Sequence, residues 1–162
     1  MIVCIDSQII IWGIKKQPAT GQEDMVSKAE AFFDWVDKEE HDVIVPAVVA
    51  AEVLVPEPDQ IRAQFLQILT RNFIIADFDT RAALKYAQLL HGRFEEIKRI
   101  ASVNDTTRQK MKVDHLIIST AIVNNASCIY SYDKALKSFA FGHIDVREFP
   151  GMAPRQGDLF PS

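Results

Sequence analysis

The chain has 162 residues, of which 48% are hydrophobic, and its formal net charge at pH 7 is −4. This length and apolar content predict one compact domain, at residues 1–150, followed by an irregular tail at 151–162. The acidic total argues against a protein that coats nucleic acid non-specifically. No apolar run approaches the roughly 20 residues that span a bilayer, so no membrane partner is expected.

The start of the chain and its cysteines bear on where the protein is located. The first residues, Met-Ile-Val-Cys-Ile-Asp, lack the basic region of a signal peptide and reach an acid too early for one. Cys4 and Cys128 fall inside predicted strands, which is typical of small buried thiols in a reducing compartment. A cytoplasmic location is therefore expected.

Strand-like and helix-like segments alternate along the chain. Short runs rich in Ile and Val predict strands, and longer segments with apolar residues at helical spacing predict amphipathic helices. This alternation predicts an α/β fold with a mostly parallel sheet covered by helices on both faces. The expected strands are 2–5, 43–45, 73–76, 128–131 and 144–149; the expected helices are 25–40, one through Glu52, 60–71, one from Thr80 capped by Asp79, 113–124 and 134–140.

Residues 93–112 carry more basic than acidic side chains. Within this segment Arg108, Lys110 and Lys112 are the candidates for contacting a substrate phosphate. A solvated helix and loop, whose charges serve solubility, accounts for the excess equally well. Both interpretations stay open from the sequence alone.

Four isolated acids lie where an apolar segment ends or is interrupted. Asp6 follows the first strand, Glu52 interrupts an apolar helix, Asp114 opens a predicted helix, and Asp133 follows the fourth strand. Ligands of open parallel sheets bind beyond the carboxyl ends of the strands, where the strand order reverses. All four carboxylates are therefore expected at one edge of the sheet, where a divalent cation would relieve their mutual repulsion.

Carboxylate oxygens are ligands that suit Mg²⁺ or Mn²⁺, which usually keep several waters and bind substrate phosphates. Such a metal lowers the pKa of its bound water and neutralises phosphate charge, so hydrolysis of nucleic acid is the predicted chemistry. Each acid also has a plainer explanation. Asp6, Asp114 and Asp133 can serve their helices as caps or first-turn acids. Glu52 can point outward from its helix, and His115 is expected to be a solvated side chain.

Taken in order, the four positions resemble the motifs of PIN-domain nucleases, and among them the VapC-type toxins of toxin-antitoxin pairs. The resemblance covers nearly the whole chain and rests on Ile5-Asp6-Ser7-Gln8, on Glu52 within residues 48–54, on residues 114–121, and on Ser131-Tyr132-Asp133-Lys134. It implies a PIN-like three-layer sandwich whose five strands have the order 3-2-1-4-5. It also implies an Mg²⁺- or Mn²⁺-dependent endoribonuclease that acts on RNA, frequently as a homodimer neutralised by an antitoxin.

The resemblance assigns catalysis and metal binding to Asp6, Glu52, Asp114 and Asp133, with Ser7 and Ser131 orienting carboxylates or waters by hydrogen bonds. Gln8 stands where the family more often has a shorter side chain, and the chain is longer than a minimal toxin. A general RNA-processing nuclease is therefore an alternative. The alternative from another class is a catalytically silent PIN-like module that binds RNA or protein.

Three other nuclease or phosphotransfer patterns are disfavoured by the sequence. An enzyme that forms an aspartyl phosphate usually has a second acid two residues after the first, where this chain has Gln8. A receiver domain would need an acidic pair beside the first strand. A restriction-type motif formed by Asp59 with Glu96 and Lys98 has a long spacing, and Glu96 lies in a helical pattern.

Overall fold

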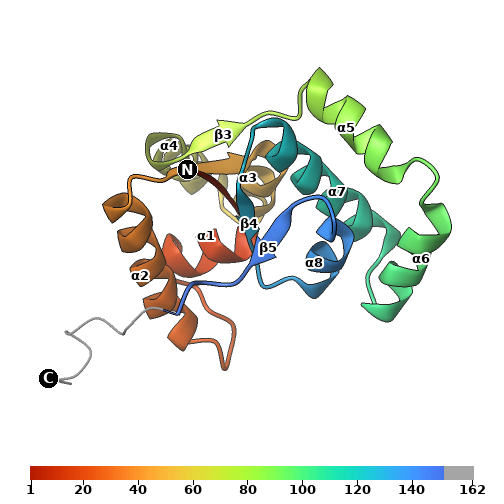
Figure 1. Ribbon diagram of the computed structural model, residues 1–162. Helices are drawn as coiled ribbons and strands as arrows, with labels where there is room; N and C mark the ends of the chain where they lie inside the picture. The colour runs from red at the N-terminus through yellow and green to blue at the C-terminus, as the bar shows by residue number, and fades with distance from the viewer. Residues whose placement is uncertain (152–162) are drawn as a thin grey trace, which may run out of the picture.

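A single five-stranded sheet forms the centre of the computed structural model, which describes residues 1–151 (Figure 1). The strand order is β3-β2-β1-β4-β5, and every neighbouring pair is parallel. The predicted α/β class and the order 3-2-1-4-5 are therefore confirmed. The strands are β1 Ile2–Ile5, β2 Asp42–Pro46, β3 Ile74–Ala76, β4 Cys128–Tyr130 and β5 Asp145–Arg147.

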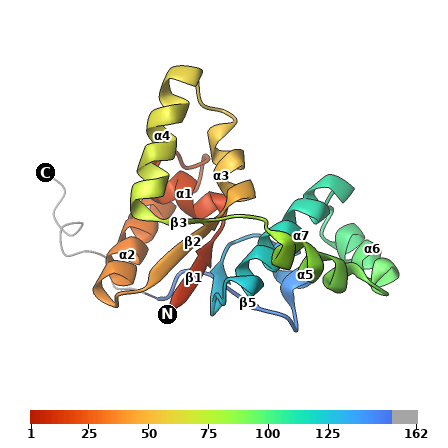
Figure 2. The same cartoon turned by 90° about the horizontal axis from the view of Figure 1, so that it is seen from above.

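Eight helices connect and cover these strands within residues 1–151. Parallel strands need right-handed crossovers, and the direction in which strands are added reverses after β3. The helices before and after β3 therefore lie on different sides of the strands, as Figure 2 shows for α1–α4 and α5–α7. The helices are α1 Ser7–Gly13, α2 Asp24–Lys38, α3 Ala47–Leu54, α4 Asp59–Asn72, α5 Thr80–Leu90, α6 Phe94–Val103, α7 Arg108–Val123 and α8 Lys134–Ala140.

The middle of the sheet is completely buried. Val3, Cys4 and Ile5 of β1 have no solvent-exposed surface, and neither do Cys128 and Ile129 of β4. A strand that is covered on both faces needs apolar residues in succession, which explains why these strands read as unbroken apolar runs. Both cysteines are free and buried, as predicted. In the part of the chain that the structure describes, no helix has the length and apolar character needed to cross a membrane.

Helix α7 begins earlier than the sequence predicted, at Arg108 instead of residue 113. Its N-cap is Thr107, whose side-chain oxygen accepts a hydrogen bond from the backbone N–H of Lys110 at 3.1 Å. The basic residues of the first turns interrupt the apolar spacing and hide this start. Asp114 consequently lies in the second turn of α7, which corrects its predicted place at the helix start.

Two further expectations concern the chain outside the sheet. Asp79 caps α5 as predicted, because its carboxylate accepts a hydrogen bond from the backbone N–H of Ala82 at 2.9 Å. The predicted irregular tail covers residues 151–162, of which 152–162 lie outside the described residues. The division into a domain at 1–150 and a tail therefore stays a prediction.

Gly13, the last residue of α1, lies directly against the ring of Phe33 in α2. A Cβ at this position would come within 2.3 Å of Phe33 Cε2 and 3.3 Å of Ala29 Cβ. We expect Gly13→Ala to lower the free energy of unfolding by about 1–3 kcal/mol, because the ring has to move. Urea unfolding measures this. Gly151→Ala is the control, since a Cβ there meets nothing within 4 Å; equal stability of the two variants would contradict the prediction.

Candidate active site

The carboxyl ends of β1 and β4 lie side by side at one edge of the sheet. Ile5 is in register with Tyr130, and the backbone N–H of Asp6 donates a hydrogen bond to the Tyr130 carbonyl at 3.1 Å. The next residues, Asp6 and Ser131, therefore leave the sheet together. This is the edge at which the strand order reverses, where the sequence predicts the site.

Both carboxylate oxygens of Asp6 are held in place. The Asp6 side chain is 6% exposed; its Oδ1 accepts from the backbone N–H of Ser7 at 2.7 Å and lies 3.3 Å from the Ser7 hydroxyl. Its Oδ2 accepts from the hydroxyl of Ser131 at 2.7 Å. The same Ser131 oxygen accepts from the backbone N–H of Asp133 at 3.0 Å. Ser131 therefore links the first acid to the fourth.

Asp133 caps α8 and also faces the other acids. Its Oδ1 accepts from the backbone N–H groups of Ala135 and Leu136, at 2.8 and 3.1 Å, and its Oδ2 forms an ion pair with the ammonium group of Lys110. Partial burial raises the pKa of Asp133, but the Lys110 ammonium and the two backbone donors outweigh it and hold the pKa below its usual value. The capping hypothesis and the cluster hypothesis are therefore compatible.

Asp114 is the most deeply buried of the four acids, with 1% of its surface exposed. Its Oδ1 lies 3.4 Å from Lys110 Nζ, while its Oδ2 is buried and has no hydrogen-bond partner. Burial raises the pKa of Asp114 to about 7, although Lys110 opposes the increase. A buried carboxylate oxygen without a partner costs free energy. A nearby cation would therefore stabilise this oxygen more than the other carboxylate oxygens of the cluster.

Glu52 lies on α3, near the same edge, with an exposed side chain. Desolvation by the surrounding protein and the charge of Asp6 raise its pKa, while Ser7 and Lys110 lower it, so Glu52 feels the same cluster. The sequence did not single out Lys15, whose side chain is 5% exposed and whose ammonium group donates to the Val53 carbonyl and to Glu57, each at 2.5 Å. These contacts hold the end of α3, the helix that carries Glu52.

Of the three candidate phosphate contacts, the structure brings Lys110 to the acids. Lys110 and Asp114 are one helical turn apart on the same face of α7. Arg108 and Lys112 are two positions away from Lys110 on either side, about 200° around the helix, and are exposed. Lys110 and Asp133 also line a cavity of about 350 Å³, which extends over Asn104, Asp105, Thr106, Thr107, Lys134 and Ala135.

His115 is a core residue, which corrects the prediction of a solvated side chain. It is 1% exposed, its ring lies 4.9 Å from that of Phe139, and its Nδ1 lies 2.8 Å from the carbonyl oxygen of Met111. Burial lowers the pKa of His115, so the neutral ring is favoured. Because a carbonyl only accepts, Nδ1 carries the proton and donates it to Met111. His115 is therefore packed in the core, although Lys112, three residues earlier in α7, is exposed.

The restriction-type motif is not assembled. Asp59 begins α4, whereas Glu96 and Lys98 belong to α6, and these helices lie far apart in both views (Figures 1 and 2). Glu96 pairs instead with Arg93 at 2.9 Å, and Lys98 lies 3.5 Å from Glu95. These charges pair locally at α6 and form no site with Asp59.

The acid cluster has the ligand chemistry of a hard cation. Asp6, Asp114, Asp133 and Glu52 supply only oxygens, and the unpartnered Asp114 Oδ2 fits a metal-ligand role. Among residues 1–151, however, no three His, Cys, Asp or Glu side chains are grouped closely enough to hold an ion. The Lys110 ammonium instead lies against Asp114 and Asp133. The residue types suit a metal, and in this structure the Lys110 ammonium lies between two of them.

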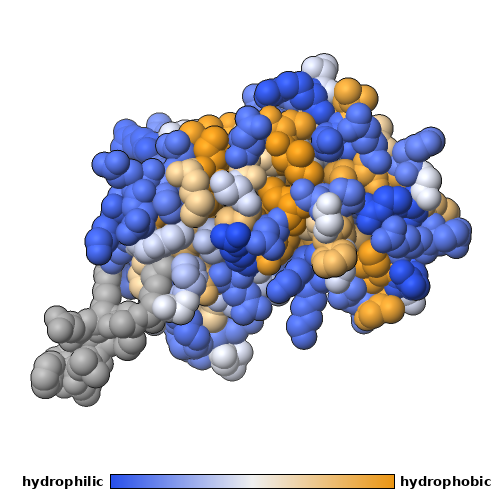
Figure 3. Space-filling model, viewed as in Figure 1, coloured by the Kyte–Doolittle hydropathy of each residue, from blue (hydrophilic) through white to orange (hydrophobic). Residues whose placement is uncertain are grey.

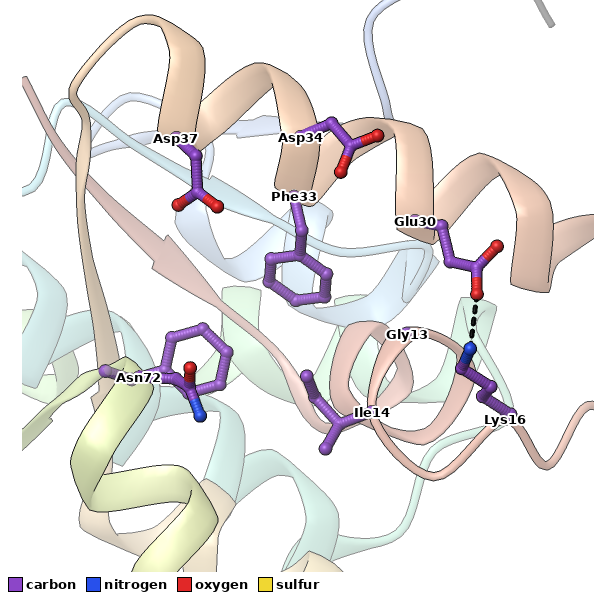
Figure 4. Close-up of a pocket in the computed structure, with 9 residues that line it drawn as sticks. Gly13, Ile14, Lys16, Glu30, Phe33, Asp34, Asp37 and Asn72 are labelled. Atoms are coloured by element: carbon purple, nitrogen blue, oxygen red, sulfur yellow. Dashed lines mark hydrogen bonds and ion pairs between the residues drawn. The ribbon is translucent and has the colours of Figure 1, made fainter. Parts of the chain in front are cut away.

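A separate concavity of about 270 Å³ lies between α2 and the ends of α1 and α4. Figure 4 shows Glu30, Asp34 and Asp37 along α2, with the ring of Phe33 below them and Lys16 paired with Glu30 at 2.5 Å. None of the four predicted acids lines it. The acid cluster at the sheet edge is therefore the candidate active site.

Comparison with known proteins gives a family and a fold. A family model described as PIN domain matches residues 3–142, a span that includes all four acids. VapBC2 from Rickettsia felis, solved with a DNA fragment from its promoter, has a TM-score of 0.61 and 17% identity, covering 93% of this chain and 100% of that chain. VapBC-1 from nontypeable Haemophilus influenzae has a TM-score of 0.64 and 13% identity, covering 92% and 98%. Curated proteins give no sequence match.

Proposed function

Because the chain belongs to the PIN domain family, whose members are generally nucleases, we propose that it is an endoribonuclease that depends on Mg²⁺ or Mn²⁺. The observation that carries this proposal is the convergence of Asp6, Asp114 and Asp133 on the switch-point edge of the sheet, with one buried oxygen left unpartnered. Glu52, whose pKa responds to Asp6, is the fourth member.

A bound metal would supply a more acidic water and neutralise charge on the phosphate. The protein's own residues orient the ligands for this role. Ser7 and Ser131 hold the two oxygens of Asp6, and the first turn of α8 holds Asp133. Asp114, with a pKa of about 7, is partly protonated near neutral pH, so metal binding should release a proton and strengthen as the pH rises.

We further propose that the protein acts as the toxin of a toxin-antitoxin pair in the cytoplasm, as a homodimer. Support comes from its structural similarity to the two VapBC complexes. Large exposed apolar side chains on the half of the chain after β3 offer surface for a protein partner. These are Phe78, Leu84, Phe94, Val103 and Phe141. Figure 3 shows that apolar patches lie among hydrophilic areas on the face of the molecule seen in Figure 1. Light scattering of the purified protein tests the dimer.

RNA cleavage by the purified protein is the decisive test of the nuclease. Single-stranded and structured RNAs are incubated with Mg²⁺, with Mn²⁺, or with EDTA. We expect fragments only when a divalent cation is present. A chain that neither cleaves RNA nor binds metal would contradict the proposal and favour the binding module. Growth arrest after induced expression, relieved by a co-expressed partner, distinguishes a toxin from a general processing nuclease.

The hydroxyl of Ser131 should affect metal affinity, although Ser131 itself is not a proposed metal ligand. We expect Ser131→Ala to weaken metal affinity about 10–100-fold, because it removes the hydroxyl that holds Asp6 Oδ2 and accepts from Asp133. Calorimetric titration with Mn²⁺ measures the change. The matched control is Ser138→Ala in α8, whose exposed hydroxyl only bonds the Lys134 carbonyl. Identical affinities of the two variants would exclude the orienting role.

A further inference from the structure

One cation of the protein contacts two of the four acids and acts on the other two through its charge. Lys110 Nζ forms ion pairs with Asp133 Oδ2 and with Asp114 Oδ1. Its charge also acts on Glu52, and the charge of Asp6 acts on Lys110 in return. The ammonium group therefore occupies the same electrostatic position that a metal ion would take.

We propose that Lys110 is a built-in counter-ion, which holds the acid cluster together without metal and is displaced when a divalent cation binds to Asp114 and Asp133. This proposal rests on the proposed metal-dependent function. A divalent cation and an ammonium group within a few ångströms of the same carboxylates repel each other. The two cannot share the site, so occupancy by one excludes the other.

The lysine has room to leave. Its side chain is 48% exposed, whereas that of Asp114 is 2% exposed, so Lys110 approaches the cluster from the solvent side. It also lines the cavity of about 350 Å³ with Thr106 and Thr107. A lysine stem is flexible, so the ammonium group can swing from the carboxylates into solvent. The exchange therefore begins with a change of the Lys110 side-chain rotamer.

Two opposite effects follow for a variant without this charge. Without metal, Lys110→Met leaves the carboxylates to repel one another, so its melting temperature should fall below that of the wild type. With metal, the competitor is gone, so Mn²⁺ should bind about tenfold more tightly to the variant. A residue that merely stabilised the fold would lower stability without raising metal affinity.

Calorimetric titration with Mn²⁺ compares the wild type, Lys110→Met and the control Lys28→Met. Lys28 forms an exposed pair with Asp24 at 2.5 Å, also four residues apart, so the control removes a similar pair away from the site. We expect tighter binding only in Lys110→Met. Equal Mn²⁺ affinity of the wild type and Lys110→Met would contradict the counter-ion role of Lys110 but would not contradict the proposed nuclease function. Absence of Mn²⁺ binding in every protein would overturn both.

A measurement on the wild type does not depend on the variant folding. Lysine acetylation by a small reagent is followed by mass spectrometry, with and without Mn²⁺. Displacement predicts that Mn²⁺ increases the labelling of Lys110 and leaves Lys28 unchanged. Labelling of Lys110 that is unchanged or reduced by Mn²⁺ would overturn the proposal.

Discussion

Asp114→Asn is expected to lower metal-dependent RNA cleavage by at least about a thousandfold. Among the four acids, only Asp114 has a buried carboxylate oxygen without a partner, so an amide there would remove the charge of a proposed metal ligand at the least exposed position. Metal stabilisation of a phosphoryl transition state contributes several kcal/mol, and each 1.4 kcal/mol is about tenfold in rate. Initial rates on one RNA substrate measure the loss.

Asp6→Asn should show a comparable loss, because Asp6 lies at the end of β1 with both oxygens held. Circular dichroism spectra of both variants should match the wild type, since an asparagine keeps the shape of the side chain. Asp59→Asn on exposed α4 is the control, and it should cleave normally. Full activity of Asp6→Asn or Asp114→Asn would refute the assignment of the site.

The stability of the metal-free protein is expected to fall as the pH rises from about 4 to 7, and Asp114 is the main cause. Burial raises its pKa in the folded protein to about 7, above the usual value of 3.8 for an accessible aspartate. The folded protein therefore binds more protons than the unfolded chain between these values, so stability decreases with pH in this window. The contribution is fully present below pH 4 and is lost above pH 7, with a magnitude of up to roughly 4 kcal/mol.

Asp114→Asn should remove the Asp114 part of this dependence, since the amide does not titrate, whereas the smaller part from the raised pKa of Glu52 should stay. Urea unfolding from pH 4 to 8 in EDTA should show the variant gaining stability over the wild type as the pH rises. Asp133→Ala is a control that should change the pH dependence of stability in the opposite direction. The pKa of Asp133 is lowered in the fold, so its contribution is present above the unfolded pKa and is lost in acid. Parallel pH profiles of Asp114→Asn and wild type would contradict the expected role.

The sheet and its switch-point edge were predictable because burial on both faces leaves a continuous apolar run. The strands around Cys4 and Ile129 were predictable in this way. Asp6 and Asp133 were placed because each follows the end of one of these apolar runs. The start of α7 was not predictable by the same reasoning. Thr107 caps a turn of basic residues that have no apolar periodicity, so a pattern based on burial overlooks it.

The same misplaced helix start explains two errors at the site. With α7 beginning at residue 113, Asp114 would be a first-turn acid and His115 a solvated neighbour. The true helix places Asp114 in its second turn, one turn after Lys110, and turns His115 into the core against Phe139. Because α7 starts at Arg108, Lys110 is helical and lies one turn before Asp114, so its ammonium group can reach the Asp114 carboxylate.

The sequence by itself determined the α/β fold, the strand order through its family resemblance, and the four acids, because apolar runs and isolated charges are local signals. Only the tertiary structure decided how these acids differ. Asp133 is held ionised by backbone donors and Lys110, whereas burial leaves Asp114 with a raised pKa and one unpartnered oxygen. A pKa depends on the solvent and charges that the fold brings around a group, and these come from residues far apart along the chain.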